Sequence, residues 1–194
     1  MLSPMKKLLA IVVLSLCFIT SSQADDISDF QIEGISVGDS LLDYMSEKDI
    51  IHKSSDKYFY KNDEYYYNFY PKLDFLKVYD SLQIIFKTND PEYIVQGIEG
   101  VIRPININKC LNKIKEIKNE IDIILNHTGV YNKVEHPHFK GSMVERYTYD
   151  LGNYQYAEVV CYDMNKKSNK VDSLYVIING QNFSKFSREV QFKK

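Results

Sequence analysis

A long stretch of helical periodicity constrains the fold of this chain more than any other feature. Apolar residues within residues 107–126 recur every three or four positions and include Cys110, with lysines and acids on the opposite side. This spacing predicts one long amphipathic helix, with Asn106 or Asn108 as its cap and Gly129 beyond its end. Three later segments instead alternate apolar and polar residues, at 143–149, 154–162 and 173–178. Such alternation is typical of strands with one buried face, so the second half predicts a long amphipathic helix packed on an antiparallel sheet.

The first half repeats this order with weaker signals. A short helix is predicted at residues 41–50. Alternating segments separated by turn-forming residues follow it, at 57–61, 65–70, 82–87 and 93–102. A helix followed by an antiparallel β-meander therefore occurs twice, which predicts the α+β class. We expect a single α+β domain over residues 25–194, with two pseudo-repeated lobes, 25–105 and 106–194, as the alternative organisation.

The start of the chain has the pattern of a cleaved export signal. Lys6 and Lys7 precede an apolar run at residues 8–20. The run is followed by Ser22 and Ala24, small residues at the two positions that a signal peptidase recognises, so cleavage is expected after Ala24. We expect residues 1–24 to be removed, which leaves no membrane span and places the mature chain in the periplasm or outside the cell.

The charge of the mature chain argues against a nucleic-acid partner. The 24 basic residues fall to 22 once the two lysines of the signal are removed, against 26 acidic residues, so the net charge is about -4. Basic residues are scattered among acids and form no stripe, apart from a locally basic tail at residues 185–194.

Two of the three cysteines, Cys110 and Cys161, lie outside the signal. Cys110 falls on the apolar stripe of the long helix, and Cys161 shares a strand face with Ala157 and Val159. Because export leads to an oxidising compartment, we predict a single disulfide between them. Two buried free thiols are the alternative.

Two overlapping serine motifs lie near the mature start. The letters GISVG match the nucleophile elbow with Ser36, and the letters GDSL follow at Ser40. The second motif resembles that of the SGNH hydrolases, which implies a small secreted serine esterase with Ser40 as nucleophile and His52 as its base. The later G-x-N-D motif and the late Asp-x-x-His of that family are missing here. We therefore favour Ser40 as a helix cap in a capping box with Asp43, with Gly34 and Gly38 permitting the bends, and expect no catalytic residue.

A second candidate for chemistry is the segment that contains His136 and His138. Two histidines two residues apart supply ligand types that zinc and copper prefer. Pro137 between them predicts an exposed, extended loop, so we expect no metal and no cofactor, with His136 and His138 as the alternative metal ligands.

The most suggestive surface is the run KYFYKNDEYYYNFYP, which holds six tyrosines and two phenylalanines. As a strand it places Tyr65, Tyr67 and Phe69 on one face and Tyr66 and Tyr70 on the other. Tyrosine offers flat apolar area with a polar tip, which favours a contact surface for a protein or glycan of the cell envelope. The alternative is that tyrosine is simply a good strand former here.

The chain as a whole resembles a group of small exported bacterial proteins with a Gly-x-x-x-Gly-Asp-Ser turn, here at residues 34–40, and one cysteine in each of the later helix and strand. Its helix-plus-meander order is also similar to β-lactamase-inhibitor-like domains and to small outer-membrane assembly lipoproteins. Both of these are binding modules, and the resemblance implies no functional residues. The sequence thus predicts an exported, non-enzymatic binding protein.

Overall fold

The fold is built on one eight-stranded antiparallel sheet. The computed structural model describes residue 27 and residues 30–192. The strand order is β3-β4-β5-β6-β10-β9-β8-β7. The strands are β3 (Asp56–Phe59), β4 (Tyr65–Tyr70), β5 (Ser81–Lys87), β6 (Val95–Ile102), β7 (Val130–Glu135), β8 (Met143–Asp150), β9 (Tyr156–Asp163) and β10 (Ser173–Asn179). The helices are α1 (Glu47–His52), α2 (Ile107–Leu125) and α3 (Gln181–Phe186), and a small hairpin pairs β1 (Gln31–Ile32) with β2 (Ile35–Ser36).

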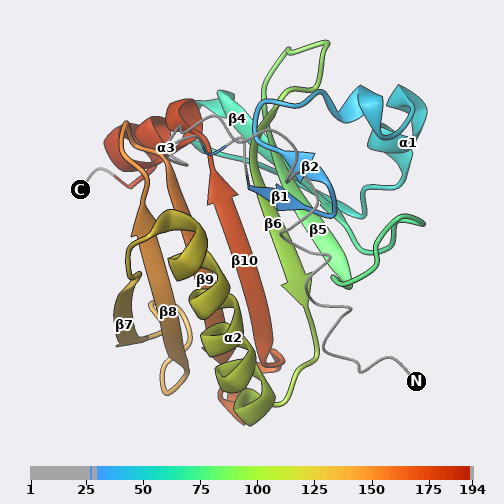
Figure 1. Ribbon diagram of the computed structural model, residues 1–194. Helices are drawn as coiled ribbons and strands as arrows, with labels where there is room; N and C mark the ends of the chain where they lie inside the picture. Colours follow the sequence, from blue (N-terminus) through green and yellow to red (C-terminus); the bar gives the residue numbers. More distant parts are fainter. Residues whose placement is uncertain (1–26, 28–29, 193–194) are drawn as a thin grey trace, which may run out of the picture.

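The predicted α+β class is confirmed, and each half of the chain contributes a helix followed by a four-stranded meander. The halves meet where β6 pairs with β10 in antiparallel register, so a single sheet runs through both (Figure 1). The main buried cluster also draws on both halves. The short first helix differs from the expectation at residues 41–50, because the chain forms a 3-10 turn at Leu41–Asp43 and then α1, which has its own cap at Ser46.

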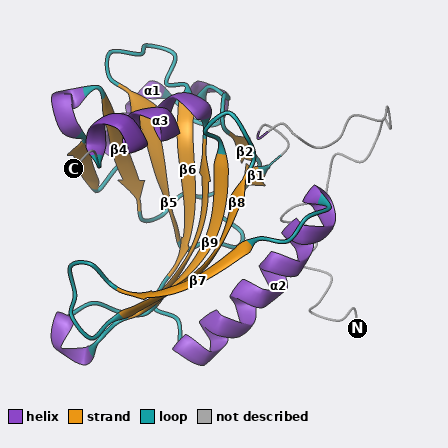
Figure 2. Ribbon diagram, turned by 90° about the vertical axis from the view of Figure 1, so that its left-hand side faces the viewer, coloured by secondary structure: helices purple, strands orange, loops and turns teal. Residues whose placement is uncertain are grey.

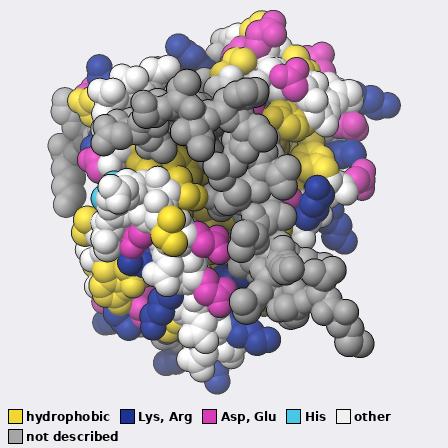
Figure 3. Space-filling view, viewed as in Figure 1, with side chains coloured by type: hydrophobic (Ala, Val, Ile, Leu, Met, Phe, Trp, Pro, Cys, Tyr) yellow, Lys and Arg dark blue, Asp and Glu magenta, His cyan; other side chains and the backbone are white. Residues whose placement is uncertain are grey.

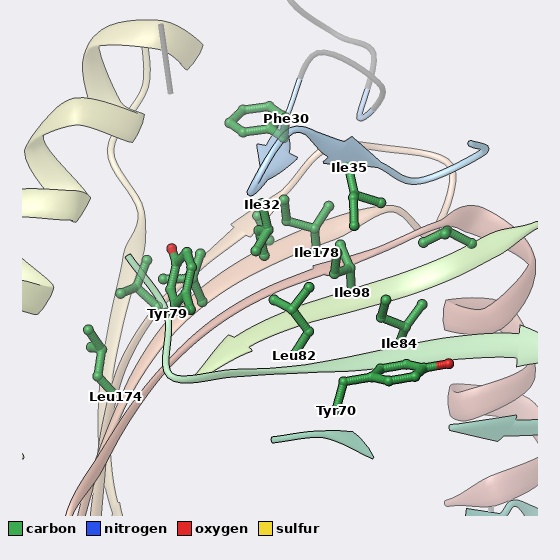
Figure 4. Close-up of a cluster of buried hydrophobic side chains, with 14 of the residues drawn as sticks. Phe30, Ile32, Ile35, Tyr70, Tyr79, Leu82, Ile84, Ile98, Leu174 and Ile178 are labelled. Carbon is green, nitrogen blue, oxygen red and sulfur yellow. The ribbon is translucent and has the colours of Figure 1, made fainter. Parts of the chain in front are cut away.

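The sheet is strongly curved, and its two faces carry different elements. Figure 2 shows α2 on the convex side and α3 on the concave side. The β1–β2 hairpin also lies on the convex side, where Ile32 and Ile35 project toward Ile98 and Ile178 of the sheet (Figure 4). Alternation along each strand therefore divides the side chains into a convex set under α2 and the hairpin and a concave set that faces the other way.

The predicted disulfide is present between Cys110 of α2 and Cys161 of β9, with the two Cα atoms 5.9 Å apart. Both cysteines are fully buried, which confirms the two face assignments made from helical and strand periodicity. The bridge ties α2 to a strand in the interior of the second meander.

The predicted signal at residues 1–24 lies outside the described residues. Within the part that the structure describes, no helix is long and apolar enough to cross a membrane. On the face seen in Figure 3, lysine and arginine side chains are interspersed with aspartate and glutamate. That mixture agrees with the scattered charge of the sequence.

Candidate functional site

Ser40 acts as a cap in the structure, as the favoured interpretation expects. Its hydroxyl donates to the carbonyl of Glu92 at 2.5 Å and accepts from the Leu42 amide at 3.3 Å. In a capping box the hydroxyl would accept from the amide of Asp43, three residues after Ser40. Here it accepts from the amide two residues after Ser40, because the element that begins at Leu41 is a tight 3-10 turn. His52 lies in α1, with its Nδ1 2.8 Å from the Lys48 carbonyl. No hydrogen bond joins Ser40 to His52 among the described residues.

The two histidines of the β7–β8 loop are adjacent to each other and to aromatic rings. His136 is half-buried and lies 4.8 Å from the ring centre of Phe139 and 5.7 Å from that of Tyr162. Its Nδ1 accepts from the amide of His138, and burial together with His138 lowers the pKa of His136. Within the described residues, no group of three or more His, Cys, Asp or Glu side chains is arranged to hold a metal ion. His136 instead forms part of the wall of a pocket.

The tyrosine-rich strand β4 alternates as predicted, but it is more deeply buried than a contact surface requires. Tyr65, Tyr66 and Tyr70 are all buried, so their rings are not available to a partner. Only Tyr67 and Phe69, on the concave face, are partly exposed. Of the five residues predicted to bind, these two keep partly exposed side chains, and a binding role for them stays a prediction.

Both faces of β4 are covered by elements distant in the sequence. On the concave side α3 places Phe186 4.8 Å from the ring centre of Tyr65. On the convex side the Tyr70 hydroxyl donates to the carbonyl of Ile50 in α1. Both rings are therefore removed from the surface, and the hydroxyl of Tyr70 is satisfied within the fold.

The concave face holds an open pocket of about 450 Å³ where the two halves of the sheet join. Glu99 of β6 and Tyr175 of β10 lie on its floor, and Tyr162 of β9 continues that floor into the second half. The β7–β8 loop supplies His136 and Phe139 as one wall. Figure 2 shows the loops at one end of the concave side and α3 at the other, so the pocket occupies one end of a larger concave surface.

Glu99 is the electrostatic centre of this pocket. Strand register places it opposite Gln83 of β5 and Ile177 of β10, neither of which carries a charge. Among the described residues, no side chain or backbone group forms a hydrogen bond or ion pair with its carboxylate. Burial, reinforced by the like charge of Glu158, raises the pKa of Glu99 from 4.5 to about 7.

Tyrosines on both sides of the join are affected by the charge of Glu99, and two of them, Tyr162 and Tyr175, line the pocket. Burial raises the pKa of each of them, and the charge of Glu99 adds to every one of these shifts, at Tyr60, Tyr67, Tyr156, Tyr162 and Tyr175. A carboxylate among phenol rings can hold a ligand by charge, hydrogen bonding and ring contact. Arg103 lies at the pocket too, with its guanidinium 4.5 Å above the ring of Phe69.

The residues that form this pocket were not among those predicted from the sequence, apart from His136. A signal for one of them does exist, because Glu99 is the one charged residue in the strand at residues 95–102. Comparison with protein-family models, with curated proteins and with solved structures finds no match to this chain.

Proposed function

We propose that this chain is an exported, non-enzymatic binding protein of the cell envelope that holds a protein partner on the concave face of its sheet. The observation that carries the proposal is the open pocket of about 450 Å³, with aromatic walls and the unpaired carboxylate of Glu99 on its floor. Concave sites lined by apolar and aromatic side chains with a few polar groups are the usual form of binding sites.

The surroundings of the pocket favour a protein over a glycan. Val144, Val160 and Ile177 form an apolar cluster on the concave face, and three tyrosines pack against it, Tyr156, Tyr162 and Tyr175. Tyrosine and arginine are the residues most enriched at the centres of protein interfaces, where they contact apolar neighbours. The concave face offers this combination over a surface wider than the pocket itself.

Two observations support export. Residues 1–24 have the pattern of a cleaved signal, and the disulfide between Cys110 and Cys161 is of a kind that persists in oxidising compartments.

Site-specific photo-crosslinking tests the proposal in the native host. A benzophenone amino acid is placed at Tyr67, on the concave face, and as a matched control at Ile123, which is 81% exposed on α2 of the convex side. We expect a protein adduct from position 67 and none from position 123. Equal adducts from both positions, or none from position 67 in a folded variant, would refute a protein partner on the concave face. An adduct that resists protease but is destroyed by periodate would replace the protein with a glycan.

A further inference from the structure

We infer that the pocket around Glu99 takes a positively charged amine, an ammonium or guanidinium group, with the Glu99 carboxylate as its counter-ion and the rings of Tyr162 and Tyr175 beside it on the floor. This inference rests on the proposed function and adds to it, because a protein partner would insert a lysine or arginine side chain here. A free polyamine presents the same chemistry.

Glu99 has no cation at the neighbouring positions of the sheet on its own face. Its neighbours on the same face of β6 are Gly97, which has no side chain, and Val101, which is buried. Its neighbours across the strands are Gln83 and Ile177. Glu99 is half-buried, and a partly buried carboxylate is stabilised most by an opposite charge, which the four nearest positions on this face do not provide.

Aromatic rings lie beside Glu99 in the pocket. Tyr162 and Tyr175 line the pocket together with Glu99, and their ring centres lie 5.2 Å apart. The faces of such rings attract cations, and the attraction is greatest where water is excluded. A carboxylate beside these tyrosines is thus suited to an ammonium or guanidinium group.

The remaining charges of the concave face are already engaged or lie at the margin. Glu158 accepts from the Thr148 hydroxyl at 2.9 Å and lies 3.6 Å from Arg146. Arg103 is exposed, stacks on Phe69 and donates a hydrogen bond to the Tyr175 phenol, which partly offsets the rise that burial causes in the pKa of that phenol. The other two basic groups at the pocket are Lys170, which is exposed, and His136, whose pKa is lowered by burial and by His138.

This balance distinguishes a cation from an anion as the ligand. The basic groups at the margin would attract an anion, whereas the floor would repel it. The shift of the Glu99 pKa to about 7 is caused by burial and by Glu158, with no cation lowering it. A bound amine would supply the missing charge, lower that pKa and release a proton.

The test is calorimetric titration of the purified protein with N-acetyl-lysine N-methylamide and, as its uncharged match, the norleucine analogue. Spermidine serves as a third probe, for a free polyamine. We expect the lysine probe or spermidine to bind and the norleucine analogue not to bind. Whichever amine binds more tightly identifies the source of the cationic group.

The pH dependence of amine binding tests whether the ionised carboxylate of Glu99 is the group that binds the amine. With a pKa of about 7, roughly a tenth of Glu99 is ionised at pH 6 and about nine-tenths at pH 8, so amine affinity should rise about tenfold between them. Glu99→Gln should abolish binding and its pH dependence. The control Glu116→Gln, on α2 of the convex side, should change neither.

Three results would overturn the inference: binding of the norleucine analogue equal to that of the lysine probe, amine binding retained by a folded Glu99→Gln variant, or saturation of the pocket by acetate. The crosslinking at Tyr67 is read separately. A protein adduct there without amine binding would remove this inference and leave the proposed function standing, and the absence of both would remove both.

Discussion

Removal of the disulfide between Cys110 and Cys161 should destabilise this protein substantially. The bridge closes a loop of 51 residues. In the chain-entropy model, a loop of this length restricts the unfolded chain enough to stabilise the fold by about 4 kcal/mol. For a domain of this size that corresponds to a decrease of roughly 8–16 °C in melting temperature.

The assay is urea denaturation followed by circular dichroism, on the oxidised protein and on protein unfolded in reductant and refolded without oxidant. Reduction has to pass through the unfolded state, because both cysteines are fully buried. A double variant, Cys110→Ala with Cys161→Ala, provides the control. It should be at least as unstable as the reduced protein, since it also loses buried sulfur atoms, and reductant should not move its midpoint.

Two outcomes would refute this reasoning. Two titratable thiols in the denatured, unreduced mature protein would mean that the cysteines are not bridged. A difference of less than about 1 kcal/mol between the oxidised and reduced forms would mean that the unfolded chain is already restricted without the bridge.

Three further predictions concern single residues. The raised pKa of Glu99 means that the folded protein keeps a proton on this carboxyl up to about pH 7, whereas the unfolded chain releases it above pH 4.5. The stabilisation from this proton is therefore complete below pH 4.5 and is lost as the pH rises to about 7, a decline of order 3 kcal/mol. Glu99→Gln should flatten the decline in urea midpoints measured from pH 4 to 8. Tyr149→Phe removes the hydroxyl that donates to Asp122 at 2.8 Å and should lower unfolding free energy by about 2 kcal/mol, whereas an unchanged midpoint would show that this bond is replaced by water. Gly100→Ala would place a Cβ 2.6 Å from the buried ring of Tyr79 and should lower the melting temperature through a loss of about 1–3 kcal/mol; no loss would mean that the ring can shift freely.

Elements with strong local signals could be predicted closely from the sequence. The helix expected at residues 107–126 is observed at Ile107–Leu125, with Asn106 as its cap and Asn126 in the left-handed conformation at its end. The strand expected at residues 65–70 is observed at Tyr65–Tyr70, so it begins and ends at the predicted residues. In each case the periodicity and the flanking polar residues lie within the element, so no knowledge of its neighbours was needed.

Elements that depend on tertiary packing were not predicted. Strand β7 is exposed along its whole length and pairs only with β8, so the alternation of buried and exposed residues that marks other strands is missing. Helix α3 has only six residues and no side-chain cap, and it is held by the packing of Phe183 and Phe186 on Tyr65. Short helices of this kind are stabilised by their contacts more than by their own sequence.

The same reason explains why the candidate site was only partly foreseen. Period two correctly divided β4 into two faces, but it carries no information on which face is covered. Coverage of Tyr65 comes from α3, more than a hundred residues later in the chain. The strand pattern therefore could not tell that Tyr65, Tyr66 and Tyr70 are buried, even though their faces were assigned correctly.

The pocket itself is a product of the join between the halves. Glu99 belongs to the first meander, while Tyr162 and Tyr175 belong to the second, and they meet because β6 pairs with β10. Separating the halves would expose the paired edges of both strands and divide the charge of the pocket from most of its aromatic wall. A lobe that ended before residue 106 would keep Glu99 without these rings, so we expect cation binding to require the whole sheet and to be absent from either half alone.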